Sequence, residues 1–282
     1  MNFINPKTDY AFKKIFGSSE SQDILKSFLN ALIYEGKSII KKLEIIDPNL
    51  PPRVQGLKDT YLDVRAFLNN DTIAIIEMQV LNVQSFDQRV LFNAAKTYSC
   101  QLQKGEGYRM LKPVIALTIT DFEMFPNSEN VISRFVYKEE TTNLIYTKND
   151  MKLIFVELPK FKRELAELET LADKWIYFMK YARSLNEVPE TMNIVPEIHQ
   201  AFVIANQVNL TREELEDMER REMFIYDQEG AILLGREEGR EEGMREKAIA
   251  IVQELLPRLD DETISQITGI SIEEVRSLRS SN

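Results

Sequence analysis

Residues 61–81 constrain the fold of this chain more than any other stretch of its sequence. Two runs rich in apolar and β-branched residues flank a short Asn-Asn-Asp turn, a pattern that predicts a β-hairpin. If the turn is centred on Asn70, strand residues pair when they lie equally far from it, so Asp63 lies opposite Glu77. Side chains alternate between the two faces of a strand, so Gln79 shares a face with Glu77. One face of one hairpin is therefore predicted to carry Asp63, Glu77 and Gln79.

The residues before Glu77 make its position chemically unusual. Isoleucines fall on both faces of this strand, which predicts a strand buried within a sheet. A carboxylate there is unfavourable unless it is paired, protonated or bound to a metal. A divalent cation between Asp63 and Glu77 would offset their repulsion, and hard oxygen ligands suit Mg²⁺ or Mn²⁺. A water on such a metal can attack a phosphodiester. Alternatively, Glu77 lies solvated at a sheet edge or pairs with Arg65.

The composition is that of an ordinary globular protein of 282 residues, which allows one large domain or a domain with an appendage. No apolar run is long enough to cross a bilayer, and the N-terminus lacks the basic start and apolar core of a secretory signal. The single cysteine, Cys100, excludes an internal disulfide and fits a reducing cytoplasm. We therefore expect a cytoplasmic protein without a membrane segment.

The same composition narrows the chemistry. Because Cys100 is the only thiol and His199 the only histidine, a zinc site of His and Cys ligands is excluded. Mechanisms that need a histidine are excluded unless His199 serves, and it lies in a helical stretch far from Asp63 in sequence. The net charge of −10 argues against a large non-specific nucleic-acid footprint, although a local basic groove stays possible.

Helices and further strands are predicted on both sides of the hairpin. Residues 5–34 predict a capped helix that stops at Gly17, followed by a second helix. Residues 84–103 predict a long helix carrying Arg89 and Lys96, which could reach a phosphate if they are not solvated or paired. Further strands are predicted at 41–46, 113–120, 131–137, 143–146 and 153–158. A hairpin, a crossover helix and another central strand give an α/β sheet flanked by helices.

Asp9 allows two interpretations. It stands in the Asn-Pro-Lys-Thr-Asp segment that starts the first helix, where it fits a helix N-cap. It could equally be a further acidic ligand beside the hairpin carboxylates. The sequence leaves both open.

The C-terminal part of the chain is predicted to be all-helical, in two regions, 161–234 and 235–282, after a core of residues 1–160. Apolar residues from Leu165 to Met179 predict one side of a long amphipathic helix. Residues 248–259 and 262–278 predict two short helices, with a break at Gly269. The outline of the last piece is that of a helix-turn-helix, but its few basic residues favour a small oligomerisation module.

The tail opens with an acidic Gly-Arg-Glu-Glu repeat that places glycine at 235, 239 and 243. In a helix these glycines would form a stripe without side chains, which lets a second helix approach. Glycine also lowers helix propensity, so the alternative is a charged, partly helical linker.

With these residues in hand, the chain resembles the recombination-promoting nucleases, a family of transposases of the PD-(D/E)XK superfamily. The resemblance covers most of the chain, and its Glu-Met-Gln run is fairly specific. The matching positions are 8–17, 62–64, 76–79, Arg89, Tyr98, 105–108 and the strand from Pro113. The repeat and the short helical end look like the family's C-terminal region.

The resemblance implies a restriction-endonuclease-like core that cleaves DNA with a bound metal. Asp63 and Glu77 would hold Mg²⁺ or Mn²⁺, and Asp9 would be an accessory acid. Gln79 stands where the wider superfamily places lysine, and it can hydrogen-bond the attacking water or the phosphate but brings no positive charge. Lys96, Arg89 or a second metal would have to supply that charge.

Two functions follow as hypotheses. The first is a cytoplasmic, metal-dependent DNA endonuclease associated with recombination, mobile elements or defence, with Asp63, Glu77 and Gln79 at its centre. The second is a catalytically weak regulatory or self-assembling protein, whose acidic tail recruits partners or joins it into homo-oligomers. The acidic balance and Gln79 favour the second.

Overall fold

The computed structural model describes residues 2–50, 60–69, 71–146 and 150–280. The chain divides into two compact units, residues 1–223 (unit 1) and 224–282 (unit 2), which are described separately. The boundary falls within one helix, α7, which spans Arg212–Leu255. Among the described residues, no helix combines the length and the apolar character needed to cross a bilayer.

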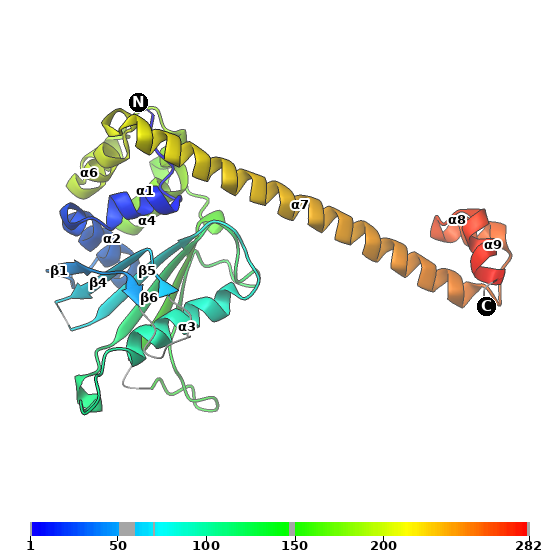
Figure 1. Ribbon diagram of the computed structural model, residues 1–282, viewed down its shortest axis with the longest axis horizontal. Helices are drawn as coiled ribbons and strands as arrows, with labels where there is room; N and C mark the ends of the chain where they lie inside the picture. Colours follow the sequence, from blue (N-terminus) through cyan, green and yellow to red (C-terminus); the bar gives the residue numbers. More distant parts are fainter. Residues whose placement is uncertain (1, 51–59, 70, 147–149, 281–282) are drawn as a thin grey trace. The chain divides into compact units, whose positions relative to one another are not determined.

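Unit 1 is built on a mixed six-stranded sheet in the order β1-β4-β5-β6-β8-β7, with helices on both faces (Figure 1). Strands β1, β4 and β5 are antiparallel, β5, β6 and β8 are parallel, and β7 returns antiparallel at the edge. The strands are β1 Leu43–Ile46, β4 Val64–Leu68, β5 Ile73–Gln79, β6 Val114–Thr120, β7 Ile132–Phe135 and β8 Met151–Glu157. A separate two-stranded sheet pairs β2 (Asn49–Leu50) with β3 (Thr60–Tyr61). This is the predicted restriction-endonuclease-like α/β architecture.

The hairpin prediction is confirmed with its register. Val64 pairs with Ile76, which is the pairing that a turn centred on Asn70 requires, although Asn70 itself lies outside the described residues. Asp71 closes the turn with a positive φ of 60°, a conformation that Asp tolerates better than most residues. A one-residue slip would have moved every side chain of β5 to the opposite face.

The crossover is also as predicted. Helix α3 (Phe86–Ser99) follows the hairpin and leads to β6, which pairs parallel with β5 along its whole length. All seven residues of β6 are buried, as expected for a strand with parallel neighbours on both sides. On β5, Ile73 and Ile75 pack on the α3 face, whereas Ala74 and Ile76 face the larger core.

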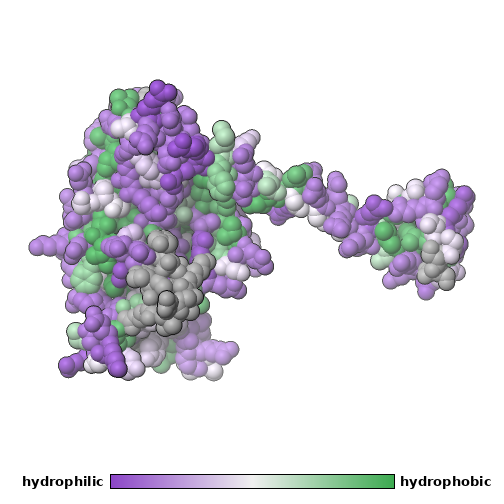
Figure 2. All heavy atoms as spheres, in the orientation of Figure 1, coloured by the Kyte–Doolittle hydropathy of each residue, from purple (hydrophilic) through white to green (hydrophobic). Residues whose placement is uncertain are grey.

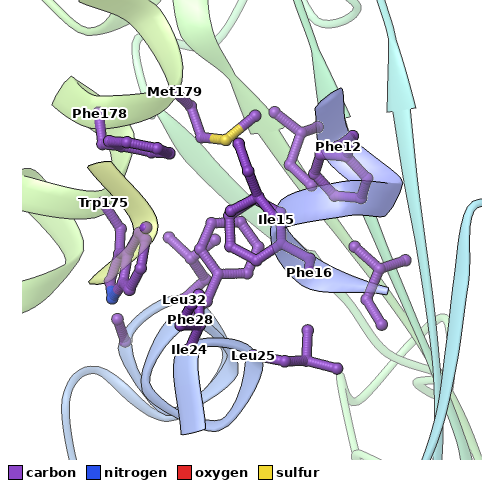
Figure 3. Close-up of a cluster of buried hydrophobic side chains, with 14 of the residues drawn as sticks. Phe12, Ile15, Phe16, Ile24, Leu25, Phe28, Leu32, Trp175, Phe178 and Met179 are labelled. Atoms are coloured by element: carbon purple, nitrogen blue, oxygen red, sulfur yellow. The ribbon is translucent and has the colours of Figure 1, made fainter. Parts of the chain in front are cut away.

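The larger core lies between the sheet and the helices on its other face. Phe16, Phe28, Trp175 and Phe178 stack against one another there with tilted and edge-to-face ring contacts (Figure 3). The helices of unit 1 besides α3 and the first part of α7 are α1 Asp9–Phe16, α2 Gln22–Tyr34, α4 Leu171–Tyr181, α5 Glu190–Asn193 and α6 Pro196–Ala205.

Two predicted elements of unit 1 are wrong. Residues 143–146 do not form a strand, and the structure shows only an isolated bridge between Ile145 and Lys138. The predicted helix from Lys160 begins only at Leu171, because Thr170 and Asp173 form a reciprocal capping box there. Residues before this box make short 3₁₀ turns instead.

Unit 2 consists of the rest of α7 and two short helices, α8 (Asp261–Thr268) and α9 (Ile272–Ser280). Gly269 ends α8 with a positive φ, as predicted, and α9 begins immediately afterwards. The side chains of Val252, Leu256 and Ile264 are buried in a small core between α7 and the two helices. The Gly-Arg-Glu-Glu repeat lies inside α7, so the helical alternative holds for this segment.

Candidate active site

Asp63, Glu77 and Gln79 lie where β4 begins and β5 ends. Asp63 immediately precedes β4, and its Oδ2 atom accepts a hydrogen bond of 2.8 Å from the backbone N–H of Met78 on β5. The adjacent ends of β5 and β6 are carboxyl ends of parallel strands, with Gln79 beside Thr120. In open α/β sheets this edge is where ligands commonly bind.

Asp63 faces helix α1 rather than the middle of the sheet. Its Oδ1 atom lies 3.7 Å from Lys13 Nζ, and its carboxyl group shares a hydrogen bond with that of Asp9. Burial raises the pKa of the Asp63 carboxyl to about 7; the Met78 amide opposes this shift and the charge of Asp9 adds to it. The pKa of Asp63 thus stays raised although the Lys13 ammonium lies beside its carboxyl group.

The helix-cap interpretation of Asp9 is wrong, because Thr8 is the N-cap and accepts a hydrogen bond from the Ala11 amide. Asp9 is the first residue of α1, and its carboxylate accepts from Lys13 at 2.7 Å and from Arg221 at 3.0 Å. Burial alone would raise the pKa of Asp9, but Lys13, the hydrogen bond with Asp63 and Arg221 together hold the pKa below its usual value. Asp9 therefore lies beside Asp63, as its interpretation as a further acidic ligand requires.

Glu77 lies on a central strand with 8% of its surface exposed, so it is not a solvated edge residue. Its Oε1 atom accepts a hydrogen bond of 2.6 Å from Asn93 Nδ2 on α3. Burial raises the pKa of Glu77, while the Asn93 hydrogen bond and the charge of Arg89 counteract part of that rise. The alternative pairing with Arg65 is not what the structure shows, because Arg65 donates to the carbonyl of Asp47.

Gln79 holds a cation in place. Its Oε1 atom accepts from Arg89 at 2.5 Å, and its Nε2 atom donates to the carbonyl of Leu81 at 2.7 Å. Exchanging the amide O and N would break both bonds, so the two partners fix the orientation of the amide. The Arg89 guanidinium also lies 4.9 Å from the centre of the Phe86 ring.

The matching family model is that of the PD-(D/E)XK nuclease family transposases, and it covers residues 6–234. The chain belongs to this family. No curated protein and no solved structure matches the sequence of this chain. The matched range includes all of the candidate residues and ends inside α7, one residue before the first glycine of the repeat.

In this family member, sequence reasoning missed two residues that contact the candidate acids. Lys13 is one helical turn after Asp9, and a search for cations on the same helix face would have found it. Asn93 follows Arg89 by one turn in the same way. Lys96 lies on α3 about one turn after Asn93. Because α3 runs in the direction opposite to β5, Lys96 lies beside the part of β5 that precedes Glu77.

The donor set fits a hard divalent cation held by few protein ligands. Among the described residues, no three Asp, Glu, His or Cys side chains converge on one point, so a metal would rely on Asp63, Glu77, backbone oxygen and water. Mg²⁺ commonly binds through one or two carboxylates and keeps several waters. Partial burial of Asp63 and burial of Glu77 raise the pKa values of both carboxyl groups, and a divalent charge would lower them.

Proposed function

We propose that the protein is a metal-dependent endonuclease that hydrolyses phosphodiester bonds in DNA and acts in the cytoplasm. The observation that carries this proposal is the pair of carboxyl groups, partly buried on Asp63 and buried on Glu77, where β4 begins and β5 ends, with Lys13 near the first and Arg89 near the second. Family membership supports the nuclease class of the activity.

In this proposal, Asp63 and Glu77 hold Mg²⁺ or Mn²⁺, and the Met78 amide and the Asn93 side chain keep the two carboxylates oriented. The bound metal supplies an activated water and neutralises charge on the phosphate. Asp9 keeps the Lys13 ammonium beside the site through a 2.7 Å ion pair.

The positive charge that Gln79 lacks comes from its neighbours. Gln79 orients the exposed Arg89 guanidinium, which can form two parallel hydrogen bonds to a phosphate. Lys13 lies on the other side of the carboxylates, within 3.7 Å of Asp63. A phosphate between them would meet a cation from α1 and a cation from α3.

The first test is nicking of supercoiled plasmid by the full-length protein with Mg²⁺, Mn²⁺ or EDTA. We expect metal-dependent nicking that falls by roughly 1000-fold in Asp63→Asn and Glu77→Gln, because loss of a metal ligand removes about 4 kcal/mol of transition-state stabilisation. Both substitutions keep the shape of the side chain and an oxygen that accepts the existing hydrogen bond.

Glu44→Gln is the matched control, since Glu44 is an exposed carboxylate on strand β1 of the same sheet. It should nick as the wild type does. Equal nicking by all four proteins would reveal a contaminant and refute the proposal. Absence of nicking in a folded wild type would instead favour the regulatory or self-assembling role.

A second test concerns the cations. Lys13→Met should lower the nicking rate by about 100-fold, the effect of removing one preorganised charge from a reacting phosphate. Lys14→Met is the control, because Lys14 is the next residue of α1 but pairs with Glu214 away from the carboxylates. Similar rates in the two variants would remove Lys13 from the proposed site.

A further inference from the structure

The part of α7 that carries the repeat is an exposed helix whose charged side chains make no ion pair with the part of the chain that the structure describes. Among the described residues, none of the arginines and glutamates between Gly235 and Gly243 makes an ion pair, although Arg245 just beyond them pairs with Glu274. A Cβ atom added at Gly235, Gly239 or Gly243 would meet nothing within 4 Å. The helix therefore presents this entire face to its surroundings.

The charges form rows on the two sides of the glycines. At about 100° per residue, Arg236 and Arg240 lie roughly 60° and 100° to one side of Gly239, and Glu242 and Glu238 lie at the same two angles on the other side. One flank of the glycine stripe is thus basic and the other is acidic. Figure 2 shows that the surface of this helix carries both hydrophilic and hydrophobic side chains.

These rows disfavour the helix on its own. Arg236 and Arg240 are like charges at positions i and i+4, and so are Glu238 and Glu242, which destabilises an isolated helix by a few tenths of a kcal/mol per pair. Each glycine in an exposed helix costs about 1 kcal/mol relative to alanine. A second helix packed against the stripe could place opposite charges beside both rows. The glycines would let the two backbones approach closely.

Apolar side chains continue the stripe toward the start of unit 2. Ile232 lies within about 20° of the direction of Gly239, and Phe224 lies about 60° from it. Their side chains are 46% and 61% exposed, respectively. The small core with α8 and α9 uses Val252 and Leu256, roughly 100–140° away, so it leaves the stripe uncovered.

We propose that this face of α7 binds the same face of a second copy of the chain, with the two helices parallel. In a parallel two-fold pair, the basic flank of each helix faces the acidic flank of its partner, so Arg236 and Arg240 meet Glu238 and Glu242 on both sides. In an antiparallel pair, basic would face basic and acidic would face acidic. Charge complementarity therefore selects both the partner and the orientation.

The test is the mass of the full-length protein in solution by light scattering across a concentration series. The wild type should approach twice the chain mass of 32.8 kDa. The pair Arg236→Glu with Arg240→Glu should stay monomeric, and so should Glu238→Arg with Glu242→Arg. An equimolar mixture of these two proteins should recover the dimer, because one then has two acidic flanks and the other two basic flanks.

A matched control uses the same repeat on its opposite side. Glu237 and Glu241 lie about 160° from Gly239, so Glu237→Arg with Glu241→Arg should leave the dimer intact. Gly239→Leu should abolish the dimer while its helix content, measured by circular dichroism, is kept or increased. A wild type that stays monomeric, or flank variants that stay dimeric, would overturn the proposal.

Orientation is tested by a single cysteine at position 228, which lies on the same face as the glycines. Gln228→Cys in a Cys100→Ser background should form an interchain disulfide on mild oxidation, because parallel helices place the two cysteines side by side. An antiparallel pair centred on Gly239 would hold them about 33 Å apart, so a dimer without crosslinking would refute the parallel arrangement.

Discussion

Charged side chains have opposite environments in the two units of this protein. In unit 1, carboxyl groups are drawn into the sheet, and each has a hydrogen-bond donor from its own chain, the Met78 amide for Asp63 and Asn93 for Glu77. In unit 2, the charges of the repeat stand in exposed rows of one sign without an ion-pair partner among the described residues. Buried charge has to be satisfied within the fold. Exposed charge can be satisfied by another molecule.

The units also differ in how they are stabilised. Unit 1 has a large core that contains the only tryptophan, Trp175, which is fully buried. The core of unit 2 is small and lies between the end of α7 and the two short helices α8 and α9. The fluorescence of Trp175 therefore reports the unfolding of unit 1, and each of the following predictions uses it to separate the two units.

The largest effect is expected in the core of unit 1. Phe28 is fully buried against Phe16 and Trp175, so Phe28→Ala should lower the free energy of unfolding by about 4 kcal/mol through lost burial and the cavity left behind. Urea titration followed by Trp175 fluorescence measures this. Val208→Ala, at a side chain that is 83% exposed, is the control and should change little. A loss below about 1 kcal/mol in Phe28→Ala would show that this cluster does not hold unit 1 together.

An effect that reaches a similar size only at high pH is expected from the partly buried charge of Asp63. Its pKa is about 7 in the folded protein and near 3.8 when unfolded, so between these values the folded state keeps a proton that the unfolded state has released. Stability therefore falls as pH rises through this window. With EDTA present, Asp63→Asn should be more stable than the wild type by up to roughly 4 kcal/mol at about pH 8, and no more stable at about pH 3.

The control for this pH series is again Glu44→Gln, on the exposed face of the edge strand. A stability difference in Asp63→Asn that is the same at both pH values would mean that packing, and not charge, is responsible. Adding Mg²⁺ should stabilise the wild type and leave Asp63→Asn unchanged.

The smallest effect is expected where the first turn of α7 meets α1. Glu214 accepts from Lys14 and Tyr10 and completes a capping box with Thr211, which together lower its pKa to about 2. This contribution is present above the ordinary pKa of 4.5 and is lost as pH falls through about 2. Glu214→Gln should cost about 0.5–1 kcal/mol near pH 7, since solvent reaches the partly exposed side chains of Glu214 and Lys14 and screens their interaction.

Glu216→Gln is the comparison for that variant, because Glu216 pairs with Arg212 on the same helix, whose side chain is 93% exposed. It should have no measurable effect on unit 1. If the two variants destabilise equally, the contact between α7 and α1 contributes nothing beyond helix electrostatics.

The sequence predicted the hairpin register because a symmetric turn and a period of two leave little freedom once β5 is buried. It failed at residues 143–146, where a short apolar run is typical of a strand but Leu144 and Ile145 stay exposed. Pattern alone cannot tell an apolar segment that meets a core from one that does not.

The site was predictable to the same extent. Glu77 and Gln79 follow from the strand, and their shared α3 face follows from its period. The contact of Asp63 with Asp9 and Lys13 did not follow, because it depends on how α1 packs against the end of the sheet. Contacts between elements are set by tertiary packing, which local patterns do not encode.

The β4–β5 hairpin also bears on the order of events in folding. Its strands are joined by the shortest connection in the sheet, and such hairpins form in about 1–10 µs, whereas β6 and β8 first require a long loop to close. Asp63 and Glu77 would then become neighbours while Glu77 is still in water and ionised. We expect its dehydration to come later, when α3 packs and Asn93 donates the hydrogen bond that the folded structure shows. We therefore expect mild acid, which discharges Glu77, to accelerate that late step.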